Sequence, residues 1–545
     1  MNKFQTKFMA LLVALFCLSS LVPAFGVEQS AEGEVSHSFS ESLKTSKLTL
    51  AQFNQAGEQA EKVTANINTL RNVPEFGGVW FENAQLIIGS TDPKNKVIED
   101  FAKQVNAKVV KTGYRDSNVQ QVFNEAKDKF SGYNAISYRY DNPDTMTIRV
   151  AMKSGKTADV ASFGELPPNI KVEVVPMEQL SQLTAGVSSD LVEPGDVFYV
   201  MQPDSLKSTC SFGFSAVAPD GSNARISAGH CKEAAKINDV IVKKGYSTLL
   251  DAGSFDVVNF SSDSKIHADV SSIKLKDQKL PNPPTISAHG NEADIQITGI
   301  ADPIPGAPVC KSGSYTGVTC GKIIDIRSQD MNEGTYIDGF GTNLDSYPGD
   351  SGGGAFIGTK AVGVQSGSTV DNDTRKLLST NFTTLSTAMK ALPGYYIKTT
   401  DEATYPVIAP LREAWLKNGG KQTTGDGKAP QQKVGDATIQ EFTNGEFVNS
   451  KSGTYFVANN IKTQWDKNGG LQGKNYGAPT SNAVTKHGSI TQNFEHGTIK
   501  ILTNKNEYYK HQTQKYLAIL ALVIIIVSGS IYKLRKTKKL GLKKR

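Results

Sequence analysis

The stretch that decides the fold of this chain runs Tyr347-Pro348-Gly349-Asp350-Ser351-Gly352-Gly353-Gly354. A serine hydroxyl is a weak nucleophile at neutral pH, so it needs a base in contact and donors aimed at the oxygen that becomes negative on attack. Glycines on both sides of a serine let the backbone turn tightly. We therefore predict that Ser351 is a nucleophile, that the N–H groups of Gly349 and Ser351 form an oxyanion hole, and that Asp350 points inward and holds the loop through a buried ion pair or hydrogen bond. Taken alone, the string is also compatible with a surface turn.

Two earlier segments favour the nucleophile loop over a surface turn. The first, Ser227-Ala228-Gly229-His230-Cys231, carries one of only seven histidines in the chain, and Cys210 lies 21 residues before Cys231. A disulfide between these cysteines would clamp the loop that bears the imidazole. The second segment runs Cys310-Lys311-Ser312-Gly313-Ser314-Tyr315-Thr316-Gly317-Val318-Thr319-Cys320-Gly321. Both lie in a region of short apolar runs separated by Gly, Pro, Asn, Asp and Ser, which is typical of all-β domains.

Taken together, the three segments resemble the bacterial chymotrypsin-like peptidases of the streptogrisin and α-lytic protease group. The matching strings are T/S-A-G-H-C around His230, C-S-x-G-F from Cys210, C-x-S-G-S-x-T-G-x-x-C-G from Cys310, and P-G-D-S-G-G around Ser351. The resemblance covers about Phe198–Pro393 and gives a predicted protease domain at residues 198–395. It implies two six-stranded antiparallel β-barrels and a serine endopeptidase that works through an acyl-enzyme without a metal or cofactor. It also implies that Gln365, Ser366 and Gly367 line the substrate pocket.

The acid of the triad is less well defined by the sequence. The order His, Asp, Ser requires an aspartate between His230 and Ser351. Asp269 is the predicted residue because His267-Ala268-Asp269-Val270 resembles the start of the family's aspartate-bearing strand, and Asp256 is the alternative. Asp345 has two interpretations. Its distance from Ser351 resembles the pocket base of trypsins, which favours Lys or Arg in substrates, but it also stands where relatives carry a cysteine of a disulfide that is missing here.

The four cysteines that remain after the first 26 residues, Cys210, Cys231, Cys310 and Cys320, are even in number and locally spaced. In an exported protein this pattern predicts the disulfides Cys210–Cys231 and Cys310–Cys320. A zinc site is the alternative, but no C-x-x-C spacing supports it.

The region before the protease domain has a different texture. Residues 1–26 read as a signal peptide, and residues 27–197 as an α+β unit. This unit shows weak helical periodicity from Leu43 onward, and its pattern predicts a hairpin at Phe76–Gly89, helices at Lys94–Ala107 and Asn118–Phe130, and strands at Tyr138–Met152 and Ile170–Val175. Phe76–Asp92 resembles the pro-regions of the same peptidase group. The resemblance implies that residues 27–197 assist folding and are then removed, which suits a β-barrel of high contact order. The alternative is an independent binding domain.

The C-terminal part contains a repeat and a membrane signal. Residues 408–502 carry W-x-x-x-G-G twice, at Trp415 and Trp465, and resemble LGFP repeats of actinobacterial envelope proteins. This implies a cell-wall polymer as partner, although each tryptophan is more often a core residue than a sugar platform. Residues 516–532 are apolar enough for one transmembrane helix, and the basic tail 533–545 predicts a cytoplasmic end.

The net charge of +6 comes from that tail, which holds eight basic residues and no acidic one. The charge therefore gives no reason to expect nucleic acid as a partner. The expected partners are a protein or peptide substrate, the membrane and the cell wall, with the catalytic domain outside the cell. The rival interpretation is an inert protease-like fold that serves as a wall-binding or adhesive surface module.

Overall fold

The computed structural model describes residues 37–504, apart from 131, 141, 154–155, 157–158, 176–178, 182–191, 203–204, 234–238, 245–247, 291, 333, 372–373 and 375, and also residues 509, 513 and 514. The predicted signal peptide, transmembrane segment 516–532 and tail 533–545 lie outside the described residues. Within the described part of the chain, no helix is both long and apolar enough to cross a membrane.

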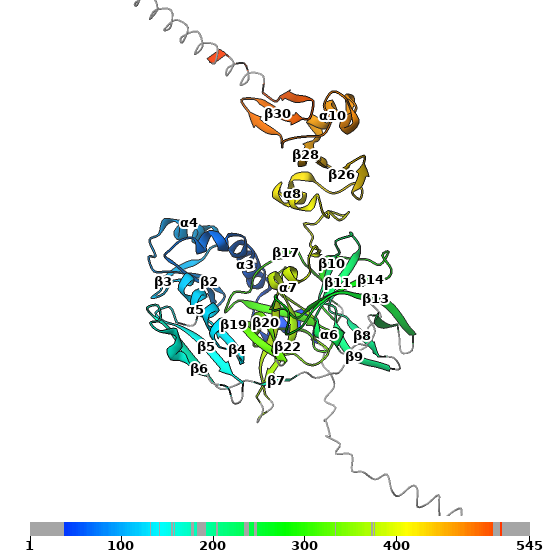
Figure 1. Ribbon diagram of the computed structural model, residues 1–545. Coiled ribbons are helices and arrows are strands. Elements are labelled where there is room, and N and C mark those ends of the chain that lie inside the picture. The colour runs from blue at the N-terminus through cyan, green and yellow to red at the C-terminus, as the bar shows by residue number, and fades with distance from the viewer. Residues whose placement is uncertain are drawn as a thin grey trace, which may run out of the picture. The chain divides into compact units, whose positions relative to one another are not determined.

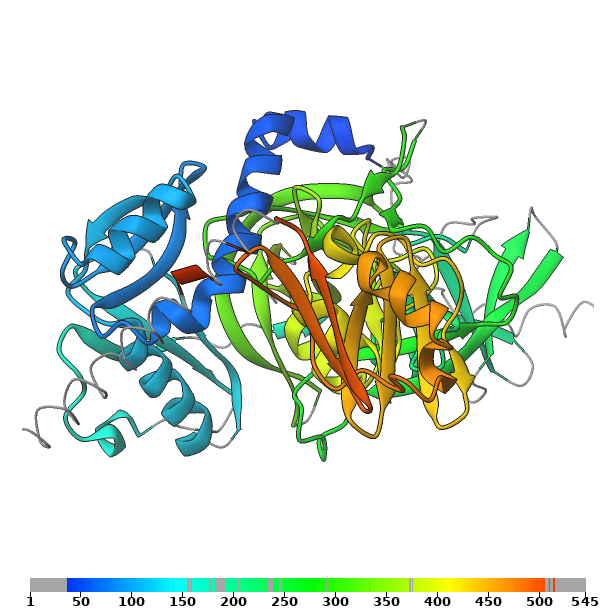
Figure 2. The same cartoon turned by 90° about the horizontal axis from the view of Figure 1, so that it is seen from above.

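The described part of the chain begins with two helices, α2 (Phe39–Thr45) and α3 (Leu50–Arg71), which meet at a bend (Figure 2). A capping box starts α3, because the Thr49 hydroxyl accepts from the Gln52 N–H at 3.2 Å and satisfies a donor that the first turn leaves free. The sequence showed only weak helical periodicity here. The buried apolar residues of α3, Phe53, Ala56, Ala60, Val63 and Leu70, do follow helical spacing, but two of them are alanines, which give a weak apolar signal.

The α+β unit follows (Figure 1). Its elements are β1 (Phe76–Glu82), β2 (Gln85–Ser90), α4 (Lys96–Gln104), β3 (Lys108–Lys111), α5 (Asp116–Lys129), β4 (Tyr133–Tyr138), β5 (Met146–Met152), η1 (Val160–Phe163), β6 (Ile170–Val175) and β7 (Gln179–Ser181). The predicted hairpin and both helices are confirmed. The prediction of a single strand over Tyr138–Met152 is wrong, because Asn142 Oδ1 accepts from the Asp144 N–H at 2.8 Å and turns the chain between β4 and β5.

Residues 197–397, which include the predicted protease domain and are called the protease region below, contain two sheets. The first consists of β8 (Val197–Gln202), β9 (Ser205–Ser211), β10 (Phe214–Val217), β11 (Asn223–Ser227), β12 (Asp239–Lys244), β13 (Thr248–Asn259), β14 (Val270–Leu275) and β24 (Tyr396–Ile397). Its strand order is β24-β10-β11-β14-β13-β12-β8-β9. Only Phe212 and Gly213 separate β9, at one edge of this sheet, from β10, which lies next to the other edge. The bend at these two residues therefore connects the two edges of the sheet. The short helix α6 (His230–Glu233) follows β11.

The second sheet is built on six consecutive strands, β18 (Pro308–Gly313), β19 (Gly317–Asn332), β20 (Thr335–Thr342), β21 (Gly354–Ile357), β22 (Lys360–Val370) and β23 (Leu377–Thr384). These six form a closed ring, since β18 pairs with both β19 and β21. The whole sheet has more strands than the predicted six, because β4 of the α+β unit pairs with β19 and continues into β5 and β6. The short pieces β15 (Thr285–Ile286), β16 (Ile295–Gln296) and β17 (Gly299–Ile300) and the helix α7 (Leu385–Ala391) complete the region.

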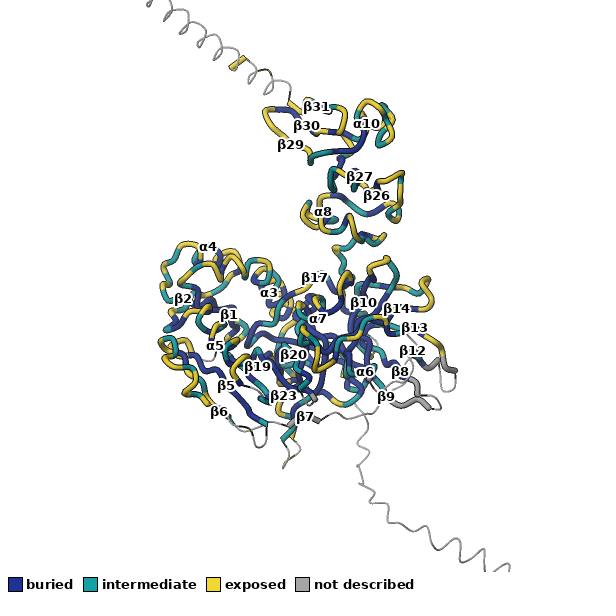
Figure 3. The backbone as a smooth tube through the Cα atoms, viewed as in Figure 1, coloured by how far each residue is buried: buried dark blue, intermediate teal, exposed yellow. Residues whose placement is uncertain are grey.

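Buried side chains concentrate in the strands of these two sheets (Figure 3). Every residue of β10, β18 and β21 is buried. One apolar cluster joins both sheets and includes Phe214, Ile226, Phe356 and Val364. The second sheet and the segments beside it therefore share a continuous core, which fixes the loops that carry the predicted site residues.

The C-terminal region contains two similar units. The first has α8 (Arg412–Lys417), α9 (Gly420–Thr424), β25 (Gln432–Val434), β26 (Ala437–Phe442), β27 (Gly445–Ser450) and β28 (Gly453–Ala458); the second has α10 (Asn459–Lys467), η2 (Gly470–Gln472), β29 (Val484–Lys486), β30 (Ser489–Phe494) and β31 (Gly497–Leu502). Trp415 and Trp465 are each 1% exposed. Their indole N–H groups donate to Thr424 Oγ1 at 3.0 Å and to the Gly477 carbonyl at 2.9 Å. Both tryptophans are thus core residues rather than exposed platforms.

A substitution in the second unit tests this core role. Trp465→Ala is expected to lower the stability of the unit by about 3–5 kcal/mol, because a large buried side chain and a satisfied N–H are lost together. Hydrogen exchange followed by mass spectrometry on peptides from β30 and β31 measures the effect. The control Val484→Ala, at a position that is 60% exposed, should leave exchange unchanged; equal protection in both variants would contradict the assignment.

Candidate active site

His230 and Asp269 lie in direct contact. Asp269 Oδ2 is 2.7 Å from His230 Nδ1, and Asp269 Oδ1 accepts from the His230 backbone N–H at 2.9 Å. His230 opens the short helix α6, and Asp269 immediately precedes β14, which pairs with β11. A carboxylate bound to both the ring and the backbone of one histidine fixes the imidazole's orientation, so Nε2 is the ring nitrogen that would act as a base.

Asp269 is fully buried, and further polar side chains surround it. Its Oδ2 accepts from the Ser366 hydroxyl, and its backbone N–H donates to Thr383 Oγ1 at 3.0 Å. Ser366 and Thr383 both lie in the second sheet, so these contacts join the two halves of the protease region. Asp256, the alternative acid, lies elsewhere: its carboxylate accepts from the Tyr395 hydroxyl and lies 3.6 Å from Lys274 Nζ.

Both expected disulfides are present, Cys210–Cys231 and Cys310–Cys320. The first ties the residue after His230 to the end of β9. The next residue of β9, Ser211, donates from its N–H to the Ser351 carbonyl at 2.7 Å and from its hydroxyl to the Gly349 carbonyl at 2.7 Å. Two adjacent residues, Cys210 and Ser211, therefore hold the histidine loop and the serine loop next to each other.

The serine loop has the conformation that its glycines predict. Gly349 and Gly352 have φ values of +102° and +88°, a region that strongly favours glycine. The loop is fixed to β22, because the Gly352 N–H donates to the Gln365 carbonyl and the Gln365 N–H donates to the Gly353 carbonyl, both at 2.9 Å. Among the described residues, no backbone carbonyl accepts from the N–H of Gly349 or of Ser351. These N–H groups are thus available to a ligand oxygen.

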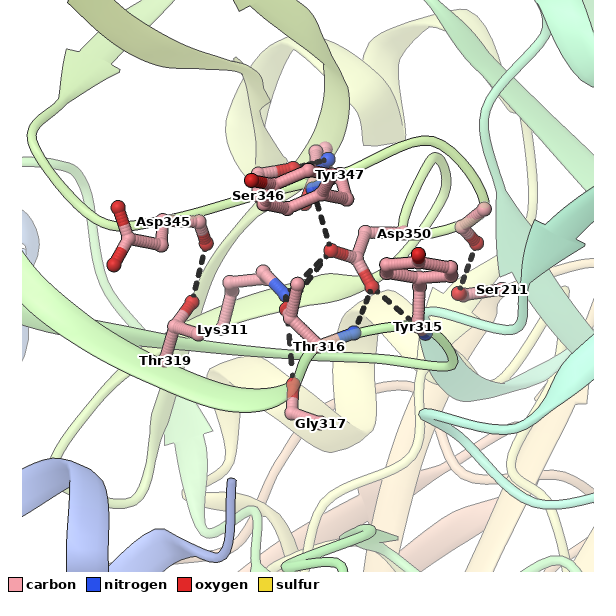
Figure 4. A network of polar contacts seen from close by, with 12 residues as sticks. Ser211, Lys311, Tyr315, Thr316, Gly317, Thr319, Asp345, Ser346, Tyr347 and Asp350 are labelled. Atoms are coloured by element: carbon pink, nitrogen blue, oxygen red, sulfur yellow. Dashed lines mark hydrogen bonds and ion pairs between the residues drawn. The ribbon is translucent and has the colours of Figure 1, made fainter. Parts of the chain in front are cut away.

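Asp350 is the centre of a buried polar network (Figure 4). Its carboxylate lies 2.9 Å from Lys311 Nζ, and neither side chain is exposed. It also accepts from the backbone N–H groups of Tyr315, Thr316 and Tyr347 at 2.9–3.0 Å and from the Thr316 hydroxyl at 2.9 Å. The prediction that Asp350 points inward and holds the loop through an ion pair or hydrogen bonds is confirmed.

The charge state of Asp350 follows from these partners. Burial alone would raise the pKa of this carboxyl, but the Lys311 ammonium and the N–H donors more than offset burial and lower the pKa below the ordinary value of 3.8. Lys311 was not among the residues that the sequence singled out. A lysine inside an apolar strand, beside a cysteine that forms a disulfide, is the signal that could have identified it.

The predicted pocket residues occupy different environments. Gln365, Ser366 and Gly367 lie on β22 and are buried, with Ser366 bound to Asp269 as described and the Gln365 side-chain amide donating to Ser346 Oγ. Asp345 is exposed; its backbone carbonyl accepts from Thr319 Oγ1 at 2.6 Å, while its carboxylate points away from Lys311 and Asp350 (Figure 4).

One metal-like cluster is present among the described residues. Cys210, His230 and Cys231 place possible ligand atoms within 4.8 Å of one another. Both sulfurs belong to the disulfide, so they offer no thiolate, and thiolate is the form of cysteine that binds zinc. The zinc interpretation of these cysteines is therefore not supported by their chemistry.

Comparisons with known proteins agree with this geometry. Streptogrisin-C of Streptomyces griseus is 29% identical over 177 residues, which is 32% of this chain and 35% of the relative. Serine protease 2 of Streptomyces fradiae is 29% identical over 160 residues, 29% of this chain and 86% of the relative. The chain resembles chymotrypsin-like serine peptidases. The chain thus spans about a third of the length of streptogrisin-C and most of that of serine protease 2.

A solved structure described as a glutamic acid specific serine protease that uses a histidine triad in substrate binding is 26% identical, with a TM-score of 0.30, over 37% of this chain and 97% of that chain. No family model matches the sequence.

The buried pair gives a stability prediction. Asp350→Asn leaves the Lys311 ammonium buried without a counter-charge, so we expect a loss of about 3–5 kcal/mol. The double variant Lys311→Met/Asp350→Asn should recover most of this loss. Circular dichroism during urea unfolding, in a Ser351→Ala background that prevents self-digestion, measures both changes. Lys417→Gln, which removes an exposed pair with Glu413, is the control and should cost less than about 1 kcal/mol.

The ion pair between Lys311 and Asp350 also makes the stability of the fold depend on pH. Because the pKa of Asp350 is lowered on folding, its contribution is fully present above pH 3.8, the ordinary value. It is lost as pH falls through the lower folded pKa. Acid unfolding that begins well above pH 4 in the wild type and is unchanged in the double variant would contradict a role for this carboxylate.

Proposed function

We propose that the chain is a serine endopeptidase of the chymotrypsin-like kind, exported as a zymogen and anchored at the cell envelope. The observation that carries the proposal is the contact of His230 with buried Asp269, next to a loop in which Ser351 directly precedes Gly352, a glycine of positive φ. The similarity to streptogrisin-C and serine protease 2 supports the same reaction class.

The proposed reaction has two halves, formation of an acyl-enzyme and its hydrolysis, and the same residues act in both. His230 Nε2 takes the proton of Ser351 Oγ as the oxygen attacks the scissile carbonyl, and the imidazolium is stabilised by the Asp269 carboxylate. The N–H groups of Gly349 and Ser351 donate to the oxyanion. His230 then protonates the leaving amine, which gives an acyl-enzyme. Water, deprotonated by His230, attacks this ester and releases the acid and the free serine.

Pairing between strands supports the zymogen part of the proposal. Residues 179–181, in β7, pair antiparallel with Ser368–Val370 at the end of β22. The same strand carries Gln365, Ser366 and Gly367, the residues proposed to bind substrate. An added strand is a common way for a sheet edge to bind an extended peptide. The N-terminal region, proposed to be the pro-region at residues 27–197, would then compete with substrate until the chain is cut.

The anchoring part rests on the sequence of the C-terminus. The segment 516–532 and the tail 533–545 are proposed as a single membrane span with a cytoplasmic end, and the units at 408–502 are proposed to contact a cell-wall polymer. Since Trp415 and Trp465 are buried, any such contact would use other side chains.

A covalent probe tests the catalytic proposal. Exposure of the exported protein to a fluorophosphonate should add one label at Ser351 in the wild type, because only an activated serine attacks the phosphorus at a useful rate. Ser351→Ala and His230→Ala should not be labelled. Peptide mass spectrometry locates the label, and intact mass spectrometry records whether the N-terminal region is lost in the wild type only.

Matched aspartate variants separate the two candidate acids. Asp269→Asn should slow labelling by about 10⁴-fold, as in other triads that lose this carboxylate, whereas Asp256→Asn should label at the wild-type rate. No labelling of the wild type, with full-length protein in every sample, would favour an inert wall-binding protein over the peptidase. Normal labelling of Asp269→Asn would exclude Asp269 from the triad.

Truncation tests the anchor. A chain that ends at Gln514 should appear in the culture medium, whereas the full chain should sediment with membranes, because the apolar segment 516–532 is absent from the shorter protein. Immunoblotting of the fractions measures the distribution. A chain that lacks only residues 533–545 is the control, and retention of the Gln514 truncation in the membrane fraction would contradict the proposed anchor.

A further inference from the structure

The N-terminal helices contribute to the core of the protease region. We call residues 37–71, with α2 and α3, the N-terminal arm. Phe53 of the arm is not exposed, and its ring centroid lies 6.0 Å from that of Phe356 on β21. Phe39 lies 6.0 Å from the same ring. Leu43 and Phe53 belong to the cluster that joins the two sheets. Removal of the arm would therefore expose apolar side chains of the second sheet to water.

The backbones of the arm and of β21 approach closely. A Cβ on Gly57 would lie 2.3 Å from the Ile357 carbonyl oxygen, and a Cβ on Gly358, whose φ is +58°, would lie 2.9 Å from Asn54 Cα. Glycine is thus needed on both sides of this contact. Packing of this closeness is typical of a protein interior rather than of a contact made to be broken.

Polar contacts fix the position of α3 along the sheet. Lys360 Nζ lies 3.0 Å from Glu58 and 2.9 Å from Glu61, and the lysine side chain is only 6% exposed. The Asp302 N–H donates to Thr64 Oγ1 at 2.7 Å. A lysine buried to this extent without the two glutamates would carry an uncompensated charge. These two ion pairs therefore join α3 to the start of β22.

The start of the arm reaches the turn that holds the serine loop. The His37 N–H donates to the Thr316 carbonyl at 3.0 Å, and the Val318 N–H donates to the His37 carbonyl at 2.8 Å. The buried Ser42 hydroxyl donates to the Val318 carbonyl. Thr316 in turn donates from its N–H and hydroxyl to Asp350. One residue, Thr316, thus connects the arm to the carboxylate that precedes the nucleophile.

We propose that the N-terminal arm stays bound to the catalytic domain after the chain is cut, and that it acts as a positioning element of the active enzyme by holding the Thr316 turn against Asp350. This inference rests on the proposed peptidase function. The arm differs in this respect from β7 and its pairing with β22, which would have to leave the substrate-binding strand. The N-terminal region would then contain an inhibitory part and a part that the enzyme keeps.

Native mass spectrometry of the processed wild-type protein tests retention. We expect the mass of a complex between the fluorophosphonate-labelled catalytic domain and a peptide that contains residues 37–71. The two should separate only in denaturant. A labelled catalytic domain that carries no such peptide would overturn the inference while leaving the peptidase function intact. Absence of any label at Ser351 would instead contradict the proposed function.

Two variants test the positioning role. After processing, we expect the arm to dissociate from the catalytic domain at least about 100-fold faster in Phe53→Ala than in the wild type. The labelling rate of the arm-free enzyme should fall at least tenfold. Leu50→Ala, on the same helix and 52% exposed, is the matched control. An arm-free enzyme that labels at the wild-type rate would overturn the positioning role.

The second variant avoids any change to the core, in case Phe53→Ala fails to fold. Glu58→Gln/Glu61→Gln removes both partners of Lys360 from the surface of α3. We expect arm dissociation to become about two- to tenfold faster, the range for partly exposed ion pairs, with a labelling rate that falls as the arm leaves. Lys62→Gln, an exposed neighbour, should match the wild type. Unchanged dissociation in the double variant would contradict the assigned contact.

Discussion

The buried ion pair between Lys311 and Asp350 connects most of the site. Asp350 lies between the two residues whose N–H groups are proposed to bind the oxyanion, so its position determines where those groups point. Lys311 follows Cys310 on β18, and the disulfide Cys310–Cys320 joins β18 to β19. The loop that carries Ser351 is thus held by the Lys311 ammonium group, which lies on a strand that the disulfide joins to its neighbour.

A buried ion pair is costly to form, because both groups lose hydration. The structure offsets that cost with further hydrogen bonds: three backbone N–H groups and the Thr316 hydroxyl donate to the Asp350 carboxylate. Such a network is stable only when every member is in place. The consequence is that the geometry of the site depends on residues around the Thr316 turn as much as on the serine loop itself.

The sequence singled out His230 and Ser351 because each lies in a short, local string of characteristic residues. Gly349 and Gly352 could be interpreted from the backbone conformation that a nucleophile loop needs, and the local spacing of the cysteines was enough to pair them. Lys311 and Ser211 were missed, since their roles depend on partners far away along the chain, Asp350 and Ser351. Resemblance alone favoured Asp269 over Asp256, and only the fold shows that one carboxylate lies against His230 while the other contacts Tyr395.

The strands of the protease region were predicted better than the long helix α3. Short apolar runs such as Val270–Leu275 carry their own signal, whereas the buried stripe of α3 contains two alanines and is weakly apolar. A polar helix of this kind is usually interpreted as a linker. Its role was not visible in the sequence, because the residues that it contacts, such as Phe356, lie far away along the chain.

In the proposed peptidase, folding and catalysis would use some of the same contacts. A closed ring of six strands pairs residues that lie far apart in the chain, and such non-local contacts form slowly. The arm supplies apolar side chains to this ring and hydrogen bonds to its Thr316 turn, and β4 adds a strand to β19. A form that lost the arm after folding would therefore lose part of the support of Asp350 and of the Ser351 loop. Because β7 pairs with Ser368–Val370, at the opposite end of β22 from Lys360, the proposed inhibition would end without loss of that support.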